Sequence, residues 1–160
     1  MKRCIIIGAS GHAKVVTDIF EKQGLYHIIG FIDAKKTVSD SFMGYPILGA
    51  EETLPELISS ETDCFLFIAI GDNYIRGQVK NRISEKLPDA KFATAIHPSA
   101  QIGKDVSIGE GSVIMAGAII NPCTIIGAFV ILNTRSSVDH DNHIEDFASL
   151  APNATTGGNV

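Results

Sequence analysis

The chain has 160 residues, of which 45% are hydrophobic and 19% are charged, and its formal net charge is −5 at pH 7. These proportions supply enough apolar side chains for a core and exclude a disordered polypeptide. No basic block could follow a phosphate backbone, which argues against nucleic acid as a partner. Only four apolar residues run unbroken into Gly8, too few for a signal or membrane-spanning segment. We therefore expect a cytoplasmic protein without a membrane partner.

Residues 1–95 alternate between the patterns of buried strands and amphipathic helices. A strand over 3–7 leads into a turn with Gly8 and Gly11, and the helix that follows ends at Gly24. The remaining elements predicted for this half are a strand over 28–32, a helix over 51–59, a strand over 64–70 and a helix over 73–86. Strands that alternate with helices predict a small parallel sheet flanked by helices, an α/β Rossmann-like domain.

Residues 96–160 carry a six-residue repeat. An aliphatic residue occupies the first position of ten successive hexapeptides: Ile96, Ile102, Ile108, Ile114, Ile120, Ile126, Leu132, Val138, Ile144 and Leu150. Nearly all residues at the fifth position are small. Strand residues two apart share a face, so positions one and five point inward and positions two to four form a turn. Three hexapeptides close a triangular coil and residues 18 apart stack, which predicts an all-β left-handed parallel β-helix.

Two glycine turns follow strands of the first domain. Gly8 and Gly11 precede a helix N-terminus, where unpaired N–H groups and the helix dipole favour a phosphate. Asp33 closes the second predicted strand, where dinucleotide-binding folds place an acid on a ribose. The turn from Gly71 to Asn73 repeats the arrangement, with Asn73 as a plausible helix cap. The turns predict a nucleotide cleft; the alternative is that the glycines serve only tight turns and close packing.

His140 and Asp141 hold positions three and four of their hexapeptide, at a corner where side chains face outward. A histidine beside a carboxylate can be oriented and held basic as a general base. One alternative is an exposed corner histidine next to a solvated acid. Another is a metal site that uses His140 and His143, for which the sequence offers no evident third ligand.

Five segments of the chain together resemble one family. They are GASGHAK at 8–14, GFID at 30–33, GYPILG at 44–49, IAIGDN at 68–73 and VDHD at 138–141. The segments are similar to those of the sialic acid O-acetyltransferases and nucleotide-4-amino-sugar N-acetyltransferases, and the resemblance covers the whole chain. It implies a Rossmann-like domain over 1–95, a β-helix acyltransferase domain over 96–160, a homotrimer, acetyl-CoA as co-substrate and no metal.

The resemblance also implies roles for individual residues. His140 would be the general base and Asp141 its acidic partner, while Gly158, one coil further on, would lie beside acetyl-CoA. The residues expected to hold the sugar nucleotide are Gly8, Ser10, Gly11, His12, Asp33, Lys35, Gly71 and Asn73.

Several features depart from the family pattern, including the ribose-side acidic pair, which is reduced to Asp33-Ala34. Where the family has IGDFxHIxPG, residues 144–153 read IEDFASLAPN, with Ser149 in the place of a histidine and Asn153 in the place of a glycine. The family also continues for several more hexapeptides. We therefore expect a β-helix truncated at its C-terminus, which lacks part of the acetyl-CoA groove.

The expected activity is acetyl transfer from acetyl-CoA to an amino or hydroxyl group of a nucleotide-activated amino sugar or a sialic acid. The sequence identifies neither the sugar nor the choice between N- and O-acetylation. Two alternatives belong to other classes: a non-catalytic trimeric nucleotide-binding scaffold, and an NAD-dependent oxidoreductase, which the glycine turn and Asp33 would suit but which leaves the repeats unexplained.

Overall fold

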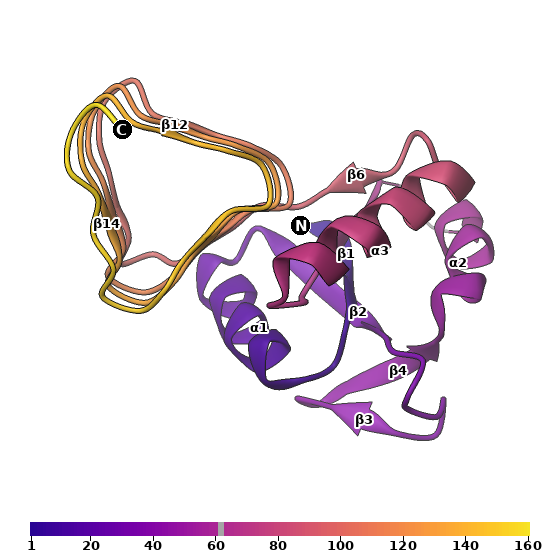
Figure 1. Cartoon of the computed structure of the whole chain (residues 1–160). Coiled ribbons are helices and arrows are strands. Elements are labelled where there is room, and N and C mark those ends of the chain that lie inside the picture. Colours follow the sequence, from indigo (N-terminus) through magenta and orange to yellow (C-terminus); the bar gives the residue numbers. More distant parts are fainter. Residues whose placement is uncertain (61–62) are drawn as a thin grey trace. The chain divides into compact units, whose positions relative to one another are not determined.

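The computed structural model describes residues 1–60 and 63–160 and divides the chain into two compact units, Met1–Ala93 and Thr94–Val160. The first unit contains a sheet with helices, and the second is a stack of triangular coils (Figure 1). The predicted fold class, an α/β domain followed by a parallel β-helix, is confirmed.

The first unit is built on a six-stranded sheet with the order β3-β4-β2-β1-β5-β6. All neighbouring strands run parallel except β3 and β4, which are antiparallel. In chain order the elements are β1 (Lys2–Ile7), α1 (Gly11–Gln23), β2 (Tyr26–Ile32), β3 (Ser41–Phe42), β4 (Tyr45–Gly49), the 3-10 turn η1 (Glu51–Thr53), α2 (Leu54–Ser60), β5 (Cys64–Ile68), α3 (Asn73–Lys86) and β6 (Lys91–Phe92).

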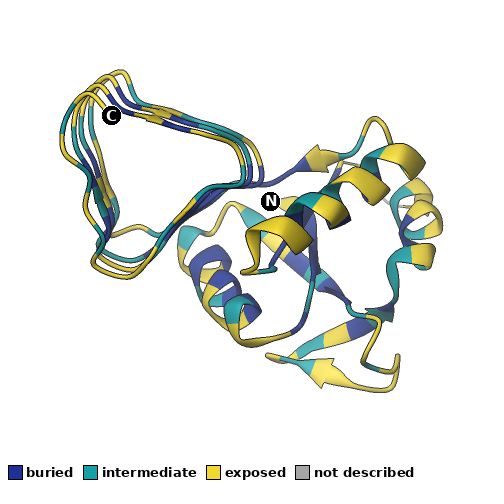
Figure 2. Cartoon of the chain, in the orientation of Figure 1, coloured by how far each residue is buried: buried dark blue, intermediate teal, exposed yellow. Residues whose placement is uncertain are grey.

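The central strands are buried because both of their faces are covered. On β1, the run from Cys4 to Ile7 is almost inaccessible to solvent, as expected for a parallel strand between layers. Helix α1 packs onto the sheet through Phe20, whose ring meets the ring of Phe67 edge-on at 5.2 Å between centroids. Figure 2 shows the resulting pattern, with the inner strands dark blue and the outward faces of the helices yellow.

Three short strands of this unit, β3, β4 and β6, were not predicted. They are too short or too irregular for an alternating pattern: β3 and β6 have two residues each, and β4 contains Pro46 and ends at Gly49. Strand β5 ends at Ile68, two residues before the predicted limit, because the chain turns at Ile70 and Gly71 toward α3. Helix α3 has the predicted bounds.

The second unit consists of two-residue strands that pair with strands 18 residues away. The strands are β7 (Ala95–Ile96), β8 (Gln101–Ile102), β9 (Ser107–Ile108), β10 (Val113–Ile114), β11 (Ile119–Ile120), β12 (Ile125–Ile126), β13 (Ile131–Leu132), β14 (Ser137–Val138), β15 (His143–Ile144) and β16 (Ser149–Leu150). They form three parallel sheets, β16-β13-β10-β7, β14-β11-β8 and β15-β12-β9, one for each side of the triangle.

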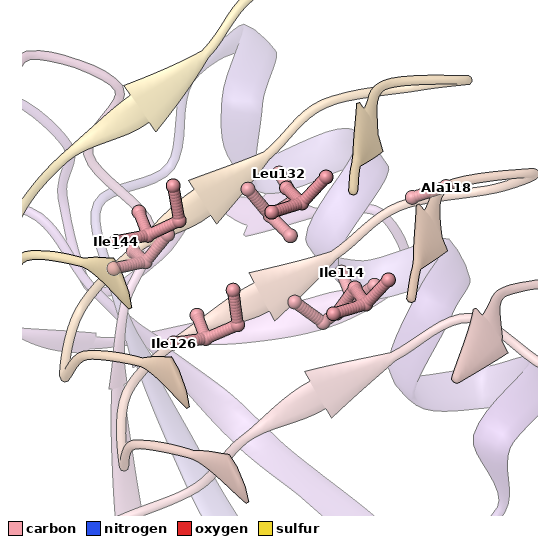
Figure 3. Packing of buried hydrophobic residues seen from close by; sticks show 8 residues of the cluster. Ile114, Ala118, Ile126, Leu132 and Ile144 are labelled. Atoms are coloured by element: carbon pink, nitrogen blue, oxygen red, sulfur yellow. The ribbon is translucent and has the colours of Figure 1, made fainter. Parts of the chain in front are cut away.

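The interior of the coils is filled by positions one and five of the repeat, as predicted. Figure 3 shows Ile114, Ile126, Leu132 and Ile144 from position one and Ala118 from position five packed in this core. Each coil covers the aliphatic residues of the next, so the coils stabilise one another.

Every turn from residue 105 to residue 159 has its fourth position in the left-handed region of backbone conformation. This position is held by glycine twice and otherwise by a residue with a side chain, including Asp141 with a φ of 54°. For a non-glycine residue this conformation costs free energy, and the stacked coils on either side enforce it. The turn geometry is therefore independent of which side chains stand at its corner.

Candidate functional site

A cavity of about 340 Å³ opens at the carboxyl edge of the sheet in the first unit. Four of the residues predicted to hold a nucleotide line it: Gly8, Ser10, Asp33 and Lys35. Helix α3 contributes Ile75, Val79 and the charged side chain of Arg82 to the lining. The other four predicted residues are not part of its lining: Gly11 and His12 begin α1, Asn73 begins α3, and Gly71 lies in the turn before α3. Folds with a parallel sheet flanked by helices bind their ligands at the carboxyl edge of the sheet.

The first glycine turn leaves polar groups and space for a ligand. Gly8 has a φ of 95°, and a Cβ at this position would lie 3.1 Å from the carbonyl oxygen of Ala69, so the turn requires glycine. Gly11 and Gly71 are different, because a Cβ on either would meet open space. Ser10 is the N-cap residue that precedes α1, yet its side chain makes no capping hydrogen bond.

Asp33 ties two loops together. Its Oδ2 accepts a hydrogen bond from the backbone N–H of Ala9 at 2.9 Å, and its Oδ1 accepts one from the N–H of Lys35 at 2.8 Å. Each carboxylate oxygen has two lone pairs, so both oxygens can accept a further bond from a ligand hydroxyl. The carboxylate therefore fixes the edge of the cavity while keeping capacity for a ribose.

The second glycine turn is held by Arg76, which sequence reasoning missed. Arg76 is 1% exposed, and its Nη1 donates to the carbonyl oxygens of Ile70 at 3.0 Å and Gly71 at 3.2 Å. Its Nη2 donates to Oδ1 of Asn73 at 2.7 Å. The expectation that Asn73 caps α3 is wrong, because the cap is Asp72, whose side chain accepts from the N–H of Ile75 at 2.9 Å. The only sequence signal for this role of Arg76 was a cationic residue three positions after Asn73.

Arg76 influences the protonation of His12. Burial, and secondly the charge of Arg76, lowers the pKa of His12 to about 4, so the imidazole is neutral at pH 7. Burial lowers the pKa of Arg76 to about 10, and Asp72 opposes that shift. Arg76 therefore remains charged at pH 7, and this unit presents a buried cation and a neutral histidine near the same edge of the sheet.

The second unit places His140 and Asp141 together at one corner. Nδ1 of His140 lies 2.7 Å from Oδ2 of Asp141, and both side chains are about half exposed, at 53% and 54%. The hydrogen bond that Nδ1 donates to Asp141, and then the charge of Asp139, raise the pKa of His140 above its usual value, while desolvation opposes the shift. A carboxylate on Nδ1 selects the tautomer with the proton on Nδ1, which leaves Nε2 as the basic nitrogen.

Nε2 of His140 faces Gly158 in the neighbouring coil. A Cβ on Gly158 would lie 2.9 Å from both Cε1 and Nε2 of His140, closer than carbon and nitrogen atoms pack. The backbone of residue 158 thus passes directly beside the basic nitrogen, and only glycine leaves it uncovered. The structure brings together the three residues predicted for the β-helix site.

Two further residues support this corner and were missed in the sequence. Asp139 accepts hydrogen bonds at Oδ1 from the N–H of His140 at 2.8 Å and from Nδ2 of Asn121 at 3.0 Å. Asn142 is 2% exposed and donates to backbone carbonyls on both sides of the turn. In the sequence both residues read as ordinary members of the repeat, so nothing distinguished them.

Within residues 1–60 and 63–160, no group of three or more His, Cys, Asp or Glu side chains is arranged to hold a metal ion. In the same described ranges, no helix has the length and apolar character to cross a bilayer.

An α/β unit with a cavity at the carboxyl edge of its sheet, followed by a β-helix of hexapeptide repeats, places the chain in the hexapeptide-repeat class of proteins. The comparisons with known proteins are more specific. The PglD N-terminal domain family matches residues 3–83, and the bacterial transferase hexapeptide family, six repeats, matches residues 99–134.

Three proteins show how similar the chain is to its relatives. UDP-N-acetylbacillosamine N-acetyltransferase of Bacillus subtilis (strain 168) is 38% identical over 117 residues, which are 72% of this chain and 52% of that protein. The acetyltransferase domain of PglB from Neisseria gonorrhoeae FA1090 in complex with acetyl coenzyme A has a TM-score of 0.85 and 32% identity, and covers 99% of this chain and 74% of its own. A histidine-to-alanine mutant of GDP-perosamine N-acetyltransferase from Caulobacter crescentus, in complex with CoA and GDP-perosamine, has a TM-score of 0.88 and 33% identity. The match covers 97% of this chain and 71% of that protein's chain.

The chain belongs to the UDP-4-amino-sugar N-acetyltransferase family, whose members join a PglD N-terminal domain to hexapeptide repeats. This confirms the resemblance seen in the sequence. The chain spans about half the length of the Bacillus relative.

Proposed function

We propose that the protein transfers an acetyl group from acetyl-CoA to the amino group of a nucleotide-linked amino sugar. The observation that carries this proposal is the His140 imidazole, oriented by Asp141 through Nδ1 and left open at Nε2 beside Gly158. The named relatives and neighbours are N-acetyltransferases of UDP- or GDP-linked sugars or bind acetyl-CoA. This favours an amine over a hydroxyl acceptor; a sialic acid acceptor stays a prediction.

In this proposal His140 acts as general base. The amine attacks the thioester carbonyl, a C–N bond forms, and Nε2 takes the proton that the nitrogen loses. The C–S bond then breaks, and the protonated imidazole returns the proton to the departing thiolate. Asp141 holds the Nδ1–H tautomer and stabilises the imidazolium that exists between the two proton transfers. The raised pKa of His140 makes it a stronger base than an isolated histidine.

The sugar nucleotide is assigned to the first unit. Its phosphates would lie near Gly8, Ser10, Gly11 and His12, where the turn opens a helix N-terminus. Its nucleoside would lie near Asp33 and Lys35 in the cavity of about 340 Å³. Gly71 and Asn73, in the second turn, would contact the same ligand. Support comes from the open space at Gly11 and from the Ser10 hydroxyl, which makes no capping bond.

Acetyl-CoA is assigned to the β-helix, with Gly158 against its reacting end. We also propose a homotrimer in the cytoplasm, in which a neighbouring chain completes the pocket around the outward-facing corner. In support, Ile119 and Ile125 at the sixth position of their repeats point outward and are 41% and 49% exposed, as expected of an apolar surface that a partner covers. A monomer in light scattering at micromolar concentration would contradict the trimer.

The test is an acetyl-transfer assay with UDP- and GDP-linked 4-amino sugars, their 4-hydroxy analogues and sialic acid. We expect release of free CoA thiol and a product heavier by one acetyl group with an amino sugar only. Binding of the nucleotide sugar without product would favour the scaffold alternative. Reduction of NAD by any of these sugars, with no use of acetyl-CoA, would favour the oxidoreductase and overturn the proposal.

A further inference from the structure

The buried side chain of Asn142 is the unusual residue at the fifth position of the repeat. Elsewhere this position holds small or β-branched residues, among them Ser112, Ala118, Thr124 and Val130. Asn142 is 2% exposed and stands directly after the catalytic pair proposed above. Because a smaller residue serves the core at every other coil, packing alone does not require an amide here.

The amide of Asn142 connects the turn that carries His140 to the next coil. Its Nδ2 donates to the carbonyl oxygen of Asp139 at 2.8 Å and approaches that of His140 at 3.2 Å. The same nitrogen donates to the carbonyl oxygen of Gly157 at 2.8 Å. One side chain thus holds the peptide groups on both sides of His140 and the residue that precedes Gly158.

The orientation of this amide is determined by its surroundings. Three carbonyl oxygens surround Nδ2, so a flipped amide would direct its own oxygen at them. In the present orientation Oδ1 is buried and has no hydrogen-bond partner among the described residues. A buried unsatisfied oxygen costs stability. The amide therefore carries a cost that a hydroxyl or methyl group at this position would avoid.

Hydroxyl groups at the fifth position show what the amide adds. Oγ of Ser112 donates to the carbonyl oxygen 15 residues further on, at Gly127, and Oγ1 of Thr124 donates to that of Asp139, both at 2.9 Å. The bond from Asn142 to Gly157 has the same spacing. A hydroxyl is therefore sufficient to link two coils, and the bonds back to the turn of His140 are what only the longer, two-donor amide supplies.

We infer that Asn142 is a positioning residue for the proposed acetyl transfer: its amide fixes the turn of His140 against the Gly157 segment and so sets where Nε2 lies. This inference rests on the proposed function. It assigns Asn142 no contact with substrate.

The groups that face His140 are few. On its own turn they are the carboxylates of Asp139 and Asp141. The preceding coil contributes Pro122, whose carbonyl accepts a hydrogen bond from the N–H of Asp141. The following coil contributes Gly157, Gly158 and Asn159, which carry no charge. A loosened turn thus weakens the two carboxylate contacts that hold the imidazole basic.

Two substitutions separate the two kinds of bond. Asn142→Thr keeps a donor for Gly157, as Thr124 does for Asp139, and removes the bonds within the turn. No carbonyl is orphaned, because that of Asp139 still accepts from Thr124 and that of His140 from the N–H of Asn159. Asn142→Val removes both the bond to Gly157 and the bonds within the turn of His140. The matched control is Ser136→Ala, which deletes another buried polar atom at the fifth position that has no partner in the described structure.

For Asn142→Thr we expect a kcat about 10-fold or more below wild type with an unchanged KM for acetyl-CoA, since misplacement of a catalytic group by less than 1 Å is costly. For Asn142→Val we expect the same loss of kcat and, in addition, a higher KM, because the segment at Gly157 is released. Ser136→Ala should match wild type. A wild-type kcat for Asn142→Thr would overturn the inference.

A second measurement needs no activity. The imidazole of His140 is followed by NMR during a pH titration, and its signals are assigned among the five histidines of the chain with His140→Ala. We expect the pKa of His140 to fall toward its ordinary value in Asn142→Thr and to stay raised in Ser136→Ala. An unchanged titration in Asn142→Thr would overturn the inference, whereas an inactive wild type with a shifted titration would contradict only the proposed function.

Discussion

Replacing Gly158 with alanine should disable His140 without unfolding the protein. The added Cβ would lie 2.9 Å from Cε1 and Nε2 and 3.4 Å from Nδ1 of His140. An ordinary contact needs about 3.5–4.0 Å, so the ring must move by about 1 Å or swing outward. His140 is exposed enough to move, and Gly158 is not in the left-handed backbone region. We expect a melting temperature within about 2 °C of wild type.

The movement breaks the geometry on which the proposed base depends. The contact of 2.7 Å between Nδ1 and Asp141 would be lost or lengthened, and the methyl group would cover Nε2. Loss of an oriented general base lowers rates by about 100-fold or more. The assay is kcat at saturating acetyl-CoA and amino sugar, together with the pH dependence of kcat/KM.

Gly157→Ala is the matched control. A Cβ on Gly157 meets open space, and this residue also lies outside the left-handed region. Its carbonyl, which Asn142 uses, is unaffected by a methyl group. We expect activity within about twofold of wild type. If Gly158→Ala were as active as Gly157→Ala, Nε2 would not act from the position that the structure shows, and the proposed role of His140 would fail.

Three further predictions concern the two candidate sites. His140→Ala should lower acetyl transfer by about 100-fold or more while calorimetry finds nucleotide-sugar binding unchanged; activity within about threefold of wild type would exclude it as the base. Gly11→Val should abolish nucleotide-sugar binding but leave acetyl-CoA binding intact, since the open space at Gly11 lets the side chain fit the fold and block a ligand. Equal loss of both affinities would contradict the assignment of the two ligands to separate units. His12, with its pKa lowered to about 4, binds more protons when unfolded, so stability should fall as pH drops from about 6.5 to about 4, by up to about 3 kcal/mol. Denaturant unfolding at both pH values should show a smaller difference in His12→Gln, and an equal difference would place the effect elsewhere.

The fold was predictable because its signals are periodic. The aliphatic residue at every sixth position reports the interior of the coil directly, and helix α3 followed from its pattern to the residue. Strand β4 was not predictable, since Pro46 and Gly49 hide its pairing with β2. Its place in the sheet depends on contacts from a distant part of the chain, which local preference does not encode.

The candidate site was predictable only in part, because sequence reveals residue types and not their hydrogen-bond partners. His140 and Asp141 stood out as charged residues at outward positions. The sequence indicated Asp33 as a ribose ligand, a role that stays a prediction, but did not reveal that each of its carboxylate oxygens also accepts a hydrogen bond from a loop N–H group. Arg76 is almost completely buried, which nothing in a polar helix start indicates. Burial of a charged side chain arises only when the tertiary structure supplies carbonyls around it.

The repeat explains why the proposed catalytic pair, His140 and Asp141, can occupy a corner of the coil. Positions one and five build the core and position four takes a left-handed turn in every coil from residue 105 on, so the residue at position three is unconstrained by packing. A histidine there costs the fold little. What it lacks is a fixed orientation, since a corner side chain is half exposed. The contacts from Asp141, the bond from the His140 N–H to Asp139 and the amide of Asn142 supply that orientation from within one turn. Residues adjacent in sequence can therefore form a site at a single corner, and the stacked coil contributes the glycine that leaves it open.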